Sequence, residues 1–455
     1  MLRVGTAAVD ITPPVGTHLA GQFHDRIAEI IHDPLHARAM VIDDGATSAA
    51  LVACDLLSLK RPTVVEVREI AAERTGVPAA NVMIAATHTH TGPRTADIFP
   101  CPSDAEYLAL LPRQIAGAVA LAARAMQPGQ IGVGSGREES ASHNRRFLRA
   151  DGTAQMHPPK GDPSFVGPEG PGDPEVGVLS ARGVDGRFLG AIVNYASHPI
   201  VVGGERAISA DYPGYLCRAL RAATGHEGEV LFVNGAFADV CPVDVYDLKH
   251  REYGYAWAER VGHAIAGEAL RVSAKADPMP SPRIRVASRR VELAIREIGE
   301  AQISEARSLL AQGEPTWRDE MTPDERFDYR EKVYAREILL LAEERRRSPT
   351  VSAELQVVAV GDAAFVGIPG EFFVELGLEV KRRSPFLFTY IAGMANGCVG
   401  YIPTRRAFQG GGYETRLARS SKLVPEAGEQ LADAAVGLLE QVSSASGERT
   451  GSPSP

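Results

Sequence analysis

The order of apolar and polar segments between Ser48 and Ala86 most constrains how this chain can fold. Residues Ser48 to Cys54 have the composition of a strand, and Pro62 to Thr75 have the apolar spacing of a helix. Val82 to Ala86 is a second short apolar run. A strand–helix–strand order indicates an α/β fold. Because further strand and helix segments follow, we predict mixed β-sheets packed with helices.

Turn residues between apolar runs predict three hairpins. The first joins His36–Asp43 to Ser48–Cys54, and the other two turn at Asp185-Gly186 and at Gly361-Asp362. A charged segment, residues 292–347, is predicted to be a helical hairpin inserted in the fold. We expect one domain over residues 1–442 and a disordered Ser/Gly/Pro-rich tail over residues 443–455.

Composition is that of an ordinary soluble protein, with 455 residues, 44% hydrophobic and 23% charged. The net charge of −9 and the lack of a long basic run argue against nucleic-acid binding. No apolar run is long enough to span a bilayer, and no secretory signal is recognisable. Five scattered cysteines suit a reducing compartment. We therefore expect a cytoplasmic protein, and its oligomeric state, a homo-oligomer included, stays open.

Several predicted strands end abruptly in a polar residue beside Pro or Gly, and sites in α/β folds gather at such ends. The residues in question are His88 and His90 in Thr-His-Thr-His-Thr-Gly-Pro, His198 before Pro199, Asp239 and Cys241 before Pro242, and Glu371 after Pro369-Gly370. If the first strand continues through both histidines, they face the same side of the pleat. Together these residues resemble a His/His/carboxylate zinc site with an open position.

Each residue also has an alternative interpretation that involves no metal. His198 fits a capped turn, and Glu371 fits an acid favoured at a helix N-terminus. Asp55, Asp211 and Asp239 are candidates for orienting zinc-bound histidines through the far ring nitrogen, and each fits equally well as a turn or helix cap.

An ordered set of motifs over most of the chain resembles the catalytic domain of the neutral (non-lysosomal) ceramidases. The matching pieces are Gly5 to Pro14, His36 to Met40, Cys54-Asp55, Thr87 to Pro93, Asn144-Arg145, Ser197 to Pro199, Ser209 to Gly214, Asn234 to Pro242, Pro369 to Glu371, Asn396 to Tyr401, and Tyr413-Glu414. The resemblance implies the fold of that domain and hydrolysis of an amide bond. The immunoglobulin-like domain that follows it in the family is not expected here.

The resemblance implies a catalytic Zn²⁺ held by two His, a Glu and a Tyr. Carried over by motif, these ligands are His88, His198, Glu371 and Tyr401. The family motif Asn-x-Tyr-x-x-Tyr is Asn-Gly-Cys398-Val-Gly-Tyr401 in this chain, so Tyr401 also fits as a packed aromatic.

The same resemblance assigns roles around the metal. His90 contacts the substrate carbonyl or a reacting hydroxyl, and Arg145 contacts the substrate beside the metal. We also assign substrate contacts to Asn144 and Asn234, which lie in two of the matched pieces. A serine of the family site is Cys241 here, and it is either a nucleophile or a small packing residue.

These observations predict a zinc-dependent hydrolase of a carbon–nitrogen bond, acting on a small molecule that carries an acyl group through a zinc-activated water. Three alternatives stay open. They are an ester or lactone hydrolase with the same site, a cysteine-based acyl hydrolase that uses Cys241, and a non-catalytic binding protein on the same fold.

Overall fold

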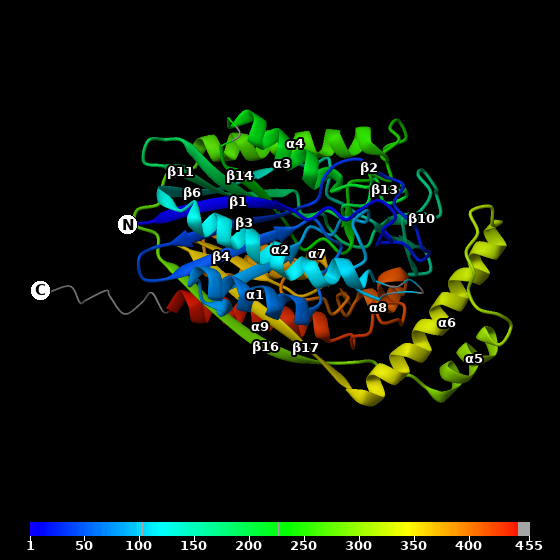
Figure 1. Ribbon diagram of the computed structural model, residues 1–455. Coiled ribbons are helices and arrows are strands. Elements are labelled where there is room, and N and C mark those ends of the chain that lie inside the picture. The colour runs from blue at the N-terminus through cyan, green and yellow to red at the C-terminus, as the bar shows by residue number, and fades with distance from the viewer. Residues whose placement is uncertain (98, 100, 102, 226, 445–455) are drawn as a thin grey trace, which may run out of the picture.

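The computed structural model describes residues 1–444, with residues 98, 100, 102 and 226 left out. Its largest element is an eight-stranded mixed sheet (Figure 1). In spatial order the strands are β14 (Glu229–Asn234), β12 (Phe188–Tyr195), β11 (Glu175–Gly183), β6 (Gln127–Arg137), β1 (Arg3–Asp10), β3 (His36–Asp43), β4 (Ser48–Cys54) and β5 (Val82–Ala86).

A second, four-stranded sheet packs face to face on the first. Its strands, in spatial order, are β16 (Ile284–Ala294), β17 (Thr350–Val360), β18 (Ala363–Gly367) and β20 (Phe388–Ala392). Side chains alternate along each strand, so one set from the large sheet, including Met40, Leu51 and Ile192, meets Val358 and Phe365 of the small sheet in one apolar cluster.

Helices cover the outer faces of both sheets. The alternate side chains of β3, β4 and β5 pack on α1 (Arg61–Thr75) and α2 (Ala105–Arg124). Those of β11, β12 and β14 pack on α3 (Asp211–Ala223) and α4 (Tyr255–Lys275). On the other side, α7 (Val374–Arg383) and α9 (Ala427–Ser444) cover the small sheet. The predicted fold class, mixed sheets packed with helices, is confirmed.

Short elements complete the chain at one end of the two sheets. They are β2 (Ile30–Ile31), η1 (Ala79–Asn81), β7 (His143–Asn144), β8 (Arg146–Arg149), β9 (Ala154–Met156), β10 (Phe165–Pro168), β13 (Ala207–Ile208), β15 (Val240–Cys241), β19 (Glu371–Phe372), β21 (Tyr401–Ile402), α8 (Ala407–Gly410) and η2 (Tyr413–Thr415). Of the described helices, none combines the length and the apolar character needed to cross a bilayer.

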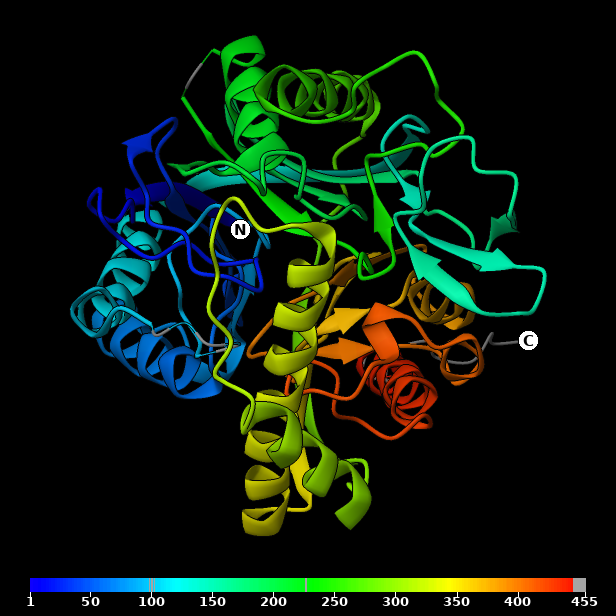
Figure 2. The same cartoon turned by 90° about the vertical axis from the view of Figure 1, so that its right-hand side faces the viewer.

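The inserted helical hairpin is shorter than predicted, because β16 continues to Ala294. Its helices are α5 (Glu300–Leu310) and α6 (Pro323–Arg347), which project at the right of Figure 1. In Figure 2 the yellow helix α6 runs across the face that is turned to the viewer. The predicted disordered tail began at Ser443, but Ser443 and Ser444 belong to α9. The rest of that tail, residues 445–455, lies outside the described part of the chain.

Candidate metal centre and active site

The segment that carries His88 and His90 leaves the sheet before the histidines. Strand β5 ends at Ala86, where its pairing with β4 also ends. His88 then takes a left-handed backbone conformation, with φ of 72°. The expectation that both rings lie on one face of a continuing strand is therefore wrong. The rings nevertheless lie near each other, with centroids 5.0 Å apart and planes at 75°.

Asn234, at the end of β14, ties the two histidine segments together. Its amide donates hydrogen bonds to the carbonyls of Thr87 and Ser197, at 3.2 and 3.1 Å. These are the residues directly before His88 and His198. Asn234 is fully buried and holds the two backbones in register, and its predicted substrate contact stays a prediction.

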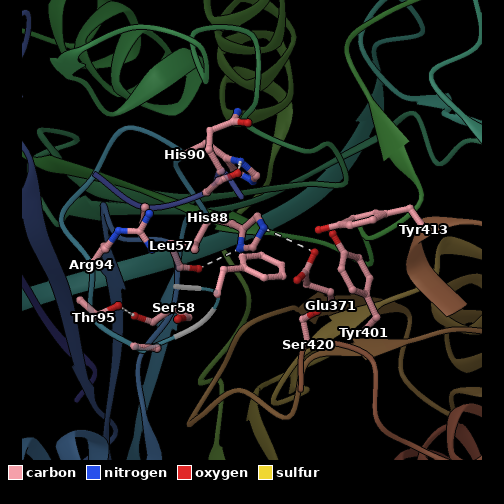
Figure 3. Close-up of a pocket in the computed structure, with 15 residues that line it drawn as sticks. Leu57, Ser58, His88, His90, Arg94, Thr95, Glu371, Tyr401, Tyr413 and Ser420 are labelled. Carbon is pink, nitrogen blue, oxygen red and sulfur yellow. Dashed lines mark hydrogen bonds and ion pairs between the residues drawn. The ribbon is translucent and has the colours of Figure 1, made fainter. Parts of the chain in front are cut away.

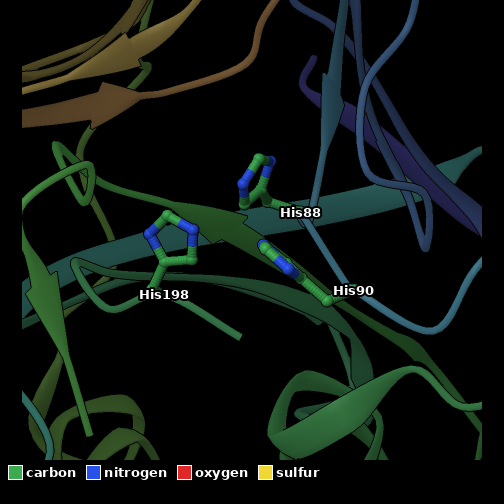
Figure 4. Close-up of side chains that lie close together, drawn as sticks. All are labelled: His88, His90 and His198. Atoms are coloured by element: carbon green, nitrogen blue, oxygen red, sulfur yellow. The ribbon is translucent and has the colours of Figure 1, made fainter. Parts of the chain in front are cut away.

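Three imidazoles converge on one point at this end of the sheet (Figure 4). One ring nitrogen from each of His88, His90 and His198 lies within 4.8 Å of the others, and all three residues are buried. Burial lowers the pKa of His88 to about 3 and holds the pKa values of His90 and His198 well below the ordinary value. The rings are therefore neutral at pH 7, which is the form that binds a metal.

Glu371 and Tyr401 approach the same point from a short two-stranded ladder beside the four-stranded sheet. They are directly paired residues of the parallel ladder β19–β21. Oε2 of Glu371 lies 3.5 Å from Nε2 of His88 (Figure 3). The same oxygen lies 3.8 Å from Nε2 of His198. Burial raises the pKa of Glu371 to about 7, against the lowering effects of a hydrogen bond from Tyr401 and of the charge of Arg145.

Unsatisfied polar atoms mark the centre of this cluster. Nε2 of His90, Nε2 of His198 and Oε2 of Glu371 are buried and have no hydrogen-bond partner in the described structure. Buried polar groups are nearly always paired, so three such atoms facing one another need an explanation. Neutral imidazole, carboxylate and phenol oxygen are ligands that Zn²⁺ accepts, and the donor set therefore fits the predicted metal.

The far ring nitrogens of His88 and His90 bond to backbone carbonyls, where carboxylates were expected. Nδ1 of His88 donates to the Leu57 carbonyl at 2.8 Å, and Nδ1 of His90 donates to the Gly21 carbonyl at 3.0 Å. Nδ1 of His198 lies 3.4 Å from the Phe237 carbonyl.

The three predicted carboxylates bond elsewhere in the described structure. Asp55 accepts from the Arg38 guanidinium, Asp211 from the amides of Val202 and Tyr212, and Asp239 from the Val374 amide and from Asn144. Burial raises the pKa values of Asp211 and Asp239 to about 7. In the described structure Asp55 thus pairs with strand β3, while Asp211 and Asp239 bond to backbone amides of nearby segments.

Arg145 lies behind the cluster and holds two of its members. Its guanidinium donates to Glu414 at 2.9 Å and to the Tyr401 hydroxyl at 3.1 Å, and Nη1 lies 3.1 Å from Nδ1 of His198. It is fully buried, which fits a positioning role and not the predicted substrate contact. Asn144, its neighbour, is also buried and is bonded to Asp239.

Cys241 belongs to the apolar cluster under α3 and α4. It is fully buried, its sulfur lies 3.9 Å from the Val243 carbonyl, and burial raises its pKa to about 12. It is not among the described residues that line the cavity beside the histidines. A thiolate nucleophile needs a lowered pKa and access, so these features favour the packing role.

A cavity of about 60 Å³ opens beside the metal ligands (Figure 3). His88, His90, Glu371 and Tyr401 form one part of its wall. The remaining lining residues are Ala20, Gly21, Gln22, Leu57, Ser58, Arg94, Thr95, Ala96, Phe99, Tyr413 and Ser420. The cluster is thus accessible from a small chamber, as a hydrolytic site requires.

Comparison with known proteins gives a consistent result. No protein-family model matches the chain. The neutral ceramidase of Pseudomonas aeruginosa is 29% identical over 231 residues, which cover 47% of this chain and 32% of that protein. The crystal structure of neutral ceramidase from the same organism superposes with a TM-score of 0.72 at 19% identity, over 100% of this chain and 76% of that chain. A structure described as ceramidase complexed with C2 gives the same TM-score at 20% identity.

The resemblance to the neutral ceramidases is confirmed. At these identities the structural match establishes a shared ceramidase fold, and the sequence match spans about a third of the curated relative. The activity and substrates of that relative are therefore considered below as proposals for this chain.

Sequence reasoning missed several residues of this candidate site. Gly21, Leu57 and Phe237 act through backbone carbonyls, which no side-chain motif reveals. Glu414 lies in a matched motif but received no role, although it is fully buried against Arg145 and Arg146. The adjacent Tyr413 lines the cavity.

Proposed function

We propose that this protein is a zinc-dependent hydrolase that cleaves the carbon–nitrogen bond of an N-acyl amide. The single observation that carries the proposal is the set of buried, unpartnered ligand atoms of His198 and Glu371, facing His88 beside a cavity. The resemblance to proteins named neutral ceramidases favours an amide over an ester or a lactone. The substrate is a small molecule with an acyl group.

The proposed ligands are His88, His198, Glu371 and Tyr401. Zinc held there lowers the pKa of a water from about 16 to about 7 and polarises an acyl carbonyl. Leu57 fixes the ring of His88 through Nδ1, so that Nε2 carries the free lone pair. Arg145 holds the Tyr401 oxygen beside the Glu371 carboxylate.

His90 is placed for proton transfer. Its Nδ1 is fixed by the Gly21 carbonyl, while its Nε2 is unpartnered and the ring lines the cavity. In this position it can carry a proton to the leaving nitrogen or donate to the carbonyl oxygen. The geometry also supports a second ligand set, in which His90 joins His88 and His198 as the third imidazole.

Metal analysis and hydrolysis assays test the proposal. We expect a chelator to abolish hydrolysis of N-acyl amides and Zn²⁺ to restore it. His88→Ala should lose both zinc and activity, whereas His263→Ala, an exposed histidine of α4, should keep both. Full activity of His88→Ala, or a protein that takes up no zinc, would refute the proposal and favour a non-catalytic binding protein.

Two further variants separate the ligand sets. If Glu371 is a ligand and His90 is not, Glu371→Gln loses zinc affinity while His90→Gln keeps the metal and loses turnover. The reverse outcome assigns the metal to the three imidazoles. If Cys241→Ala retains activity, a cysteine nucleophile is excluded. Assays with matched amide, ester and lactone substrates show which type of bond the protein cleaves. A cytoplasmic location remains a prediction, to be tested by cell fractionation.

A further inference from the structure

A recess of about 670 Å³ adjoins the candidate site. We call it the α6 recess, because α6 forms one wall, while β9 and the segment 408–416 form the others. Tyr413 lines both this recess and the small cavity beside the histidines. The Tyr413 ring lies 5.5 Å from that of Tyr401. A ligand that reaches past Tyr413 therefore connects the proposed metal centre with the α6 recess.

The walls of the α6 recess are rich in aromatic rings. They come from Phe23, Phe327, Tyr334, Phe408 and Tyr413. Phe327 is 58% exposed and contributes its ring to this wall, so apolar surface is available to a ligand in the recess. Aromatic walls of this kind hold apolar groups through contact area and ring stacking. The recess thus suits an apolar arm of a ligand.

The same recess carries an excess of positive charge. Three guanidinium groups, those of Arg296, Arg330 and Arg416, line it together with one carboxylate, that of Glu331. Arg416 and Glu331 neutralise each other through two hydrogen bonds of 2.9 and 2.6 Å.

The other two guanidinium groups have no acid partner. Arg296 donates to the carbonyls of Thr415 and Ser421, and its Nε is buried without a partner. No carboxylate pairs with Arg330 anywhere in the described structure. In the described structure, Arg296 and Arg330 therefore lack a carboxylate partner on the wall of a recess that five aromatic rings also line.

We propose that the α6 recess binds a carboxylate that the substrate carries on an apolar or aromatic arm. Arg330 is the residue placed to receive it, because guanidinium binds carboxylate through paired hydrogen bonds. This inference rests on the proposed function in one respect, namely that the molecule bound in the recess is the substrate of the proposed hydrolase. It names the substrate class as N-acyl amides whose amine part carries an anionic group at the far end of an apolar arm, over neutral amides.

Binding of small probes to the purified protein tests the recess directly. The probes are 3-phenylpropanoate and 3-phenylpropanamide, which differ in charge and hardly in shape. By calorimetry we expect the carboxylate to bind at least fivefold more tightly. Arg330→Gln should remove that difference, and Arg330→Lys should restore part of it. Arg346→Gln, an exposed position on the same helix, should leave both affinities unchanged.

Two outcomes overturn the inference. One is equal affinity of the two probes for the wild-type protein, with absence of binding at 20 mM counted as equal. The other is a carboxylate preference that survives in Arg330→Gln, which would locate the anion elsewhere, for instance at a bound metal.

A kinetic comparison separates this inference from the proposed function. N-acetyl-4-(2-aminoethyl)benzoate and N-acetyl-2-phenylethylamine share the scissile amide and the ring, and only the first carries a carboxylate, at the far end of the ring. We expect kcat/KM to favour the first at least tenfold, mainly through KM, and Arg330→Gln to lose this preference. Hydrolysis of both without preference refutes the anionic arm. Selective probe binding without any hydrolysis refutes the amidase proposal and leaves the recess assignment standing.

Discussion

Gly21 determines where the His90 ring lies. Its carbonyl accepts the hydrogen bond from Nδ1 of His90, and its backbone has φ of 91°, a conformation that favours glycine. A Cβ at this position would lie 2.5 Å from Nδ1 and 2.6 Å from Cγ of the ring. A contact that close forces the ring to move. The position of the proposed proton carrier therefore depends on a residue without a side chain.

We expect Gly21→Ala to lower turnover by a factor of about 100, since a displacement of about 1 Å of a catalytic group has effects of that size. Zinc content should stay at the wild-type level if His90 is not a ligand. Gly16→Ala is the matched control, because Gly16 has φ of 94° but nothing within 4 Å of an added Cβ. Both variants bear similar backbone strain, so equal turnover in the two would contradict this role of Gly21.

At its end near Trp317, the helical hairpin of α5 and α6 is held to the body by a small set of contacts, whereas ion pairs such as Glu331–Arg416 and Glu337–Arg419 hold α6 further along. The His24 and Trp317 rings stack with centroids 3.9 Å apart, and the Tyr329 hydroxyl donates to the Phe23 carbonyl at 2.9 Å. Arg326 lies over the other side of this contact, 5.6 Å from the Trp317 ring centroid. The hairpin is thus anchored to the loop that also carries Gly21.

Trp317→Ala should loosen the hairpin without unfolding the sheets. We expect amide exchange in α5 and in the first turns of α6 to become at least tenfold faster, because local openings need only break these few contacts. Exchange in β3, β4 and β17 should stay unchanged. Leu340→Ala, a partly exposed position of α6, is the control. Faster exchange throughout the sheets would show that the hairpin is part of the main cooperative unit.

The sequence predicted strands and hairpins correctly where apolar and polar side chains alternate or where Gly and Asp indicate a turn. The three hairpins with Asp-Gly or Gly-Asp turns are examples. The predicted helical segment, residues 292–347, includes the last three residues of the edge strand β16, where the exposed Glu292 gives the strand a charged character. Helix α4 gave no clear signal, because much of its buried face is small, as at Ala258 and Gly262.

The side chains of the candidate site could be predicted from the sequence, but their backbone partners could not. Convergence of His88, His198 and Glu371 followed from polar residues at strand ends. The hydrogen-bond partners of the far ring nitrogens could not be predicted, because every residue has a backbone carbonyl and no sequence motif marks the one that is used.

In the whole molecule, the proposed ligands join the two sheets. His88 and His198 follow β5 and β12 of the large sheet, whereas Glu371 and Tyr401 pair beside the small one. A metal ion bound by all four residues would link segments as far apart in the sequence as His88 and Tyr401. Such an ion binds the folded chain and has no equivalent site in the unfolded one, so it stabilises the fold.

We expect zinc at 100 times its Kd to stabilise the protein by about 2.7 kcal/mol. For a chain of this size that corresponds to a rise in Tm of about 3 °C. Calorimetric scans with and without Zn²⁺ measure it, and Mg²⁺ serves as a control ion. His263→Ala should keep the rise and His88→Ala should lose it. An equal rise in His88→Ala would mean that zinc binds elsewhere.

The parallel pairing of Glu371 with Tyr401 has a consequence for metal exchange. Both oxygens are carried by one two-residue ladder and move together when that ladder shifts, whereas the imidazoles lie on loops that follow β5 and β12 of the large sheet. Crystal structures with ions of increasing radius should therefore keep a constant oxygen-to-oxygen spacing, while the spacing between oxygens and imidazole nitrogens widens. The site would then adapt to its ion along a single direction, across the seam between the sheets.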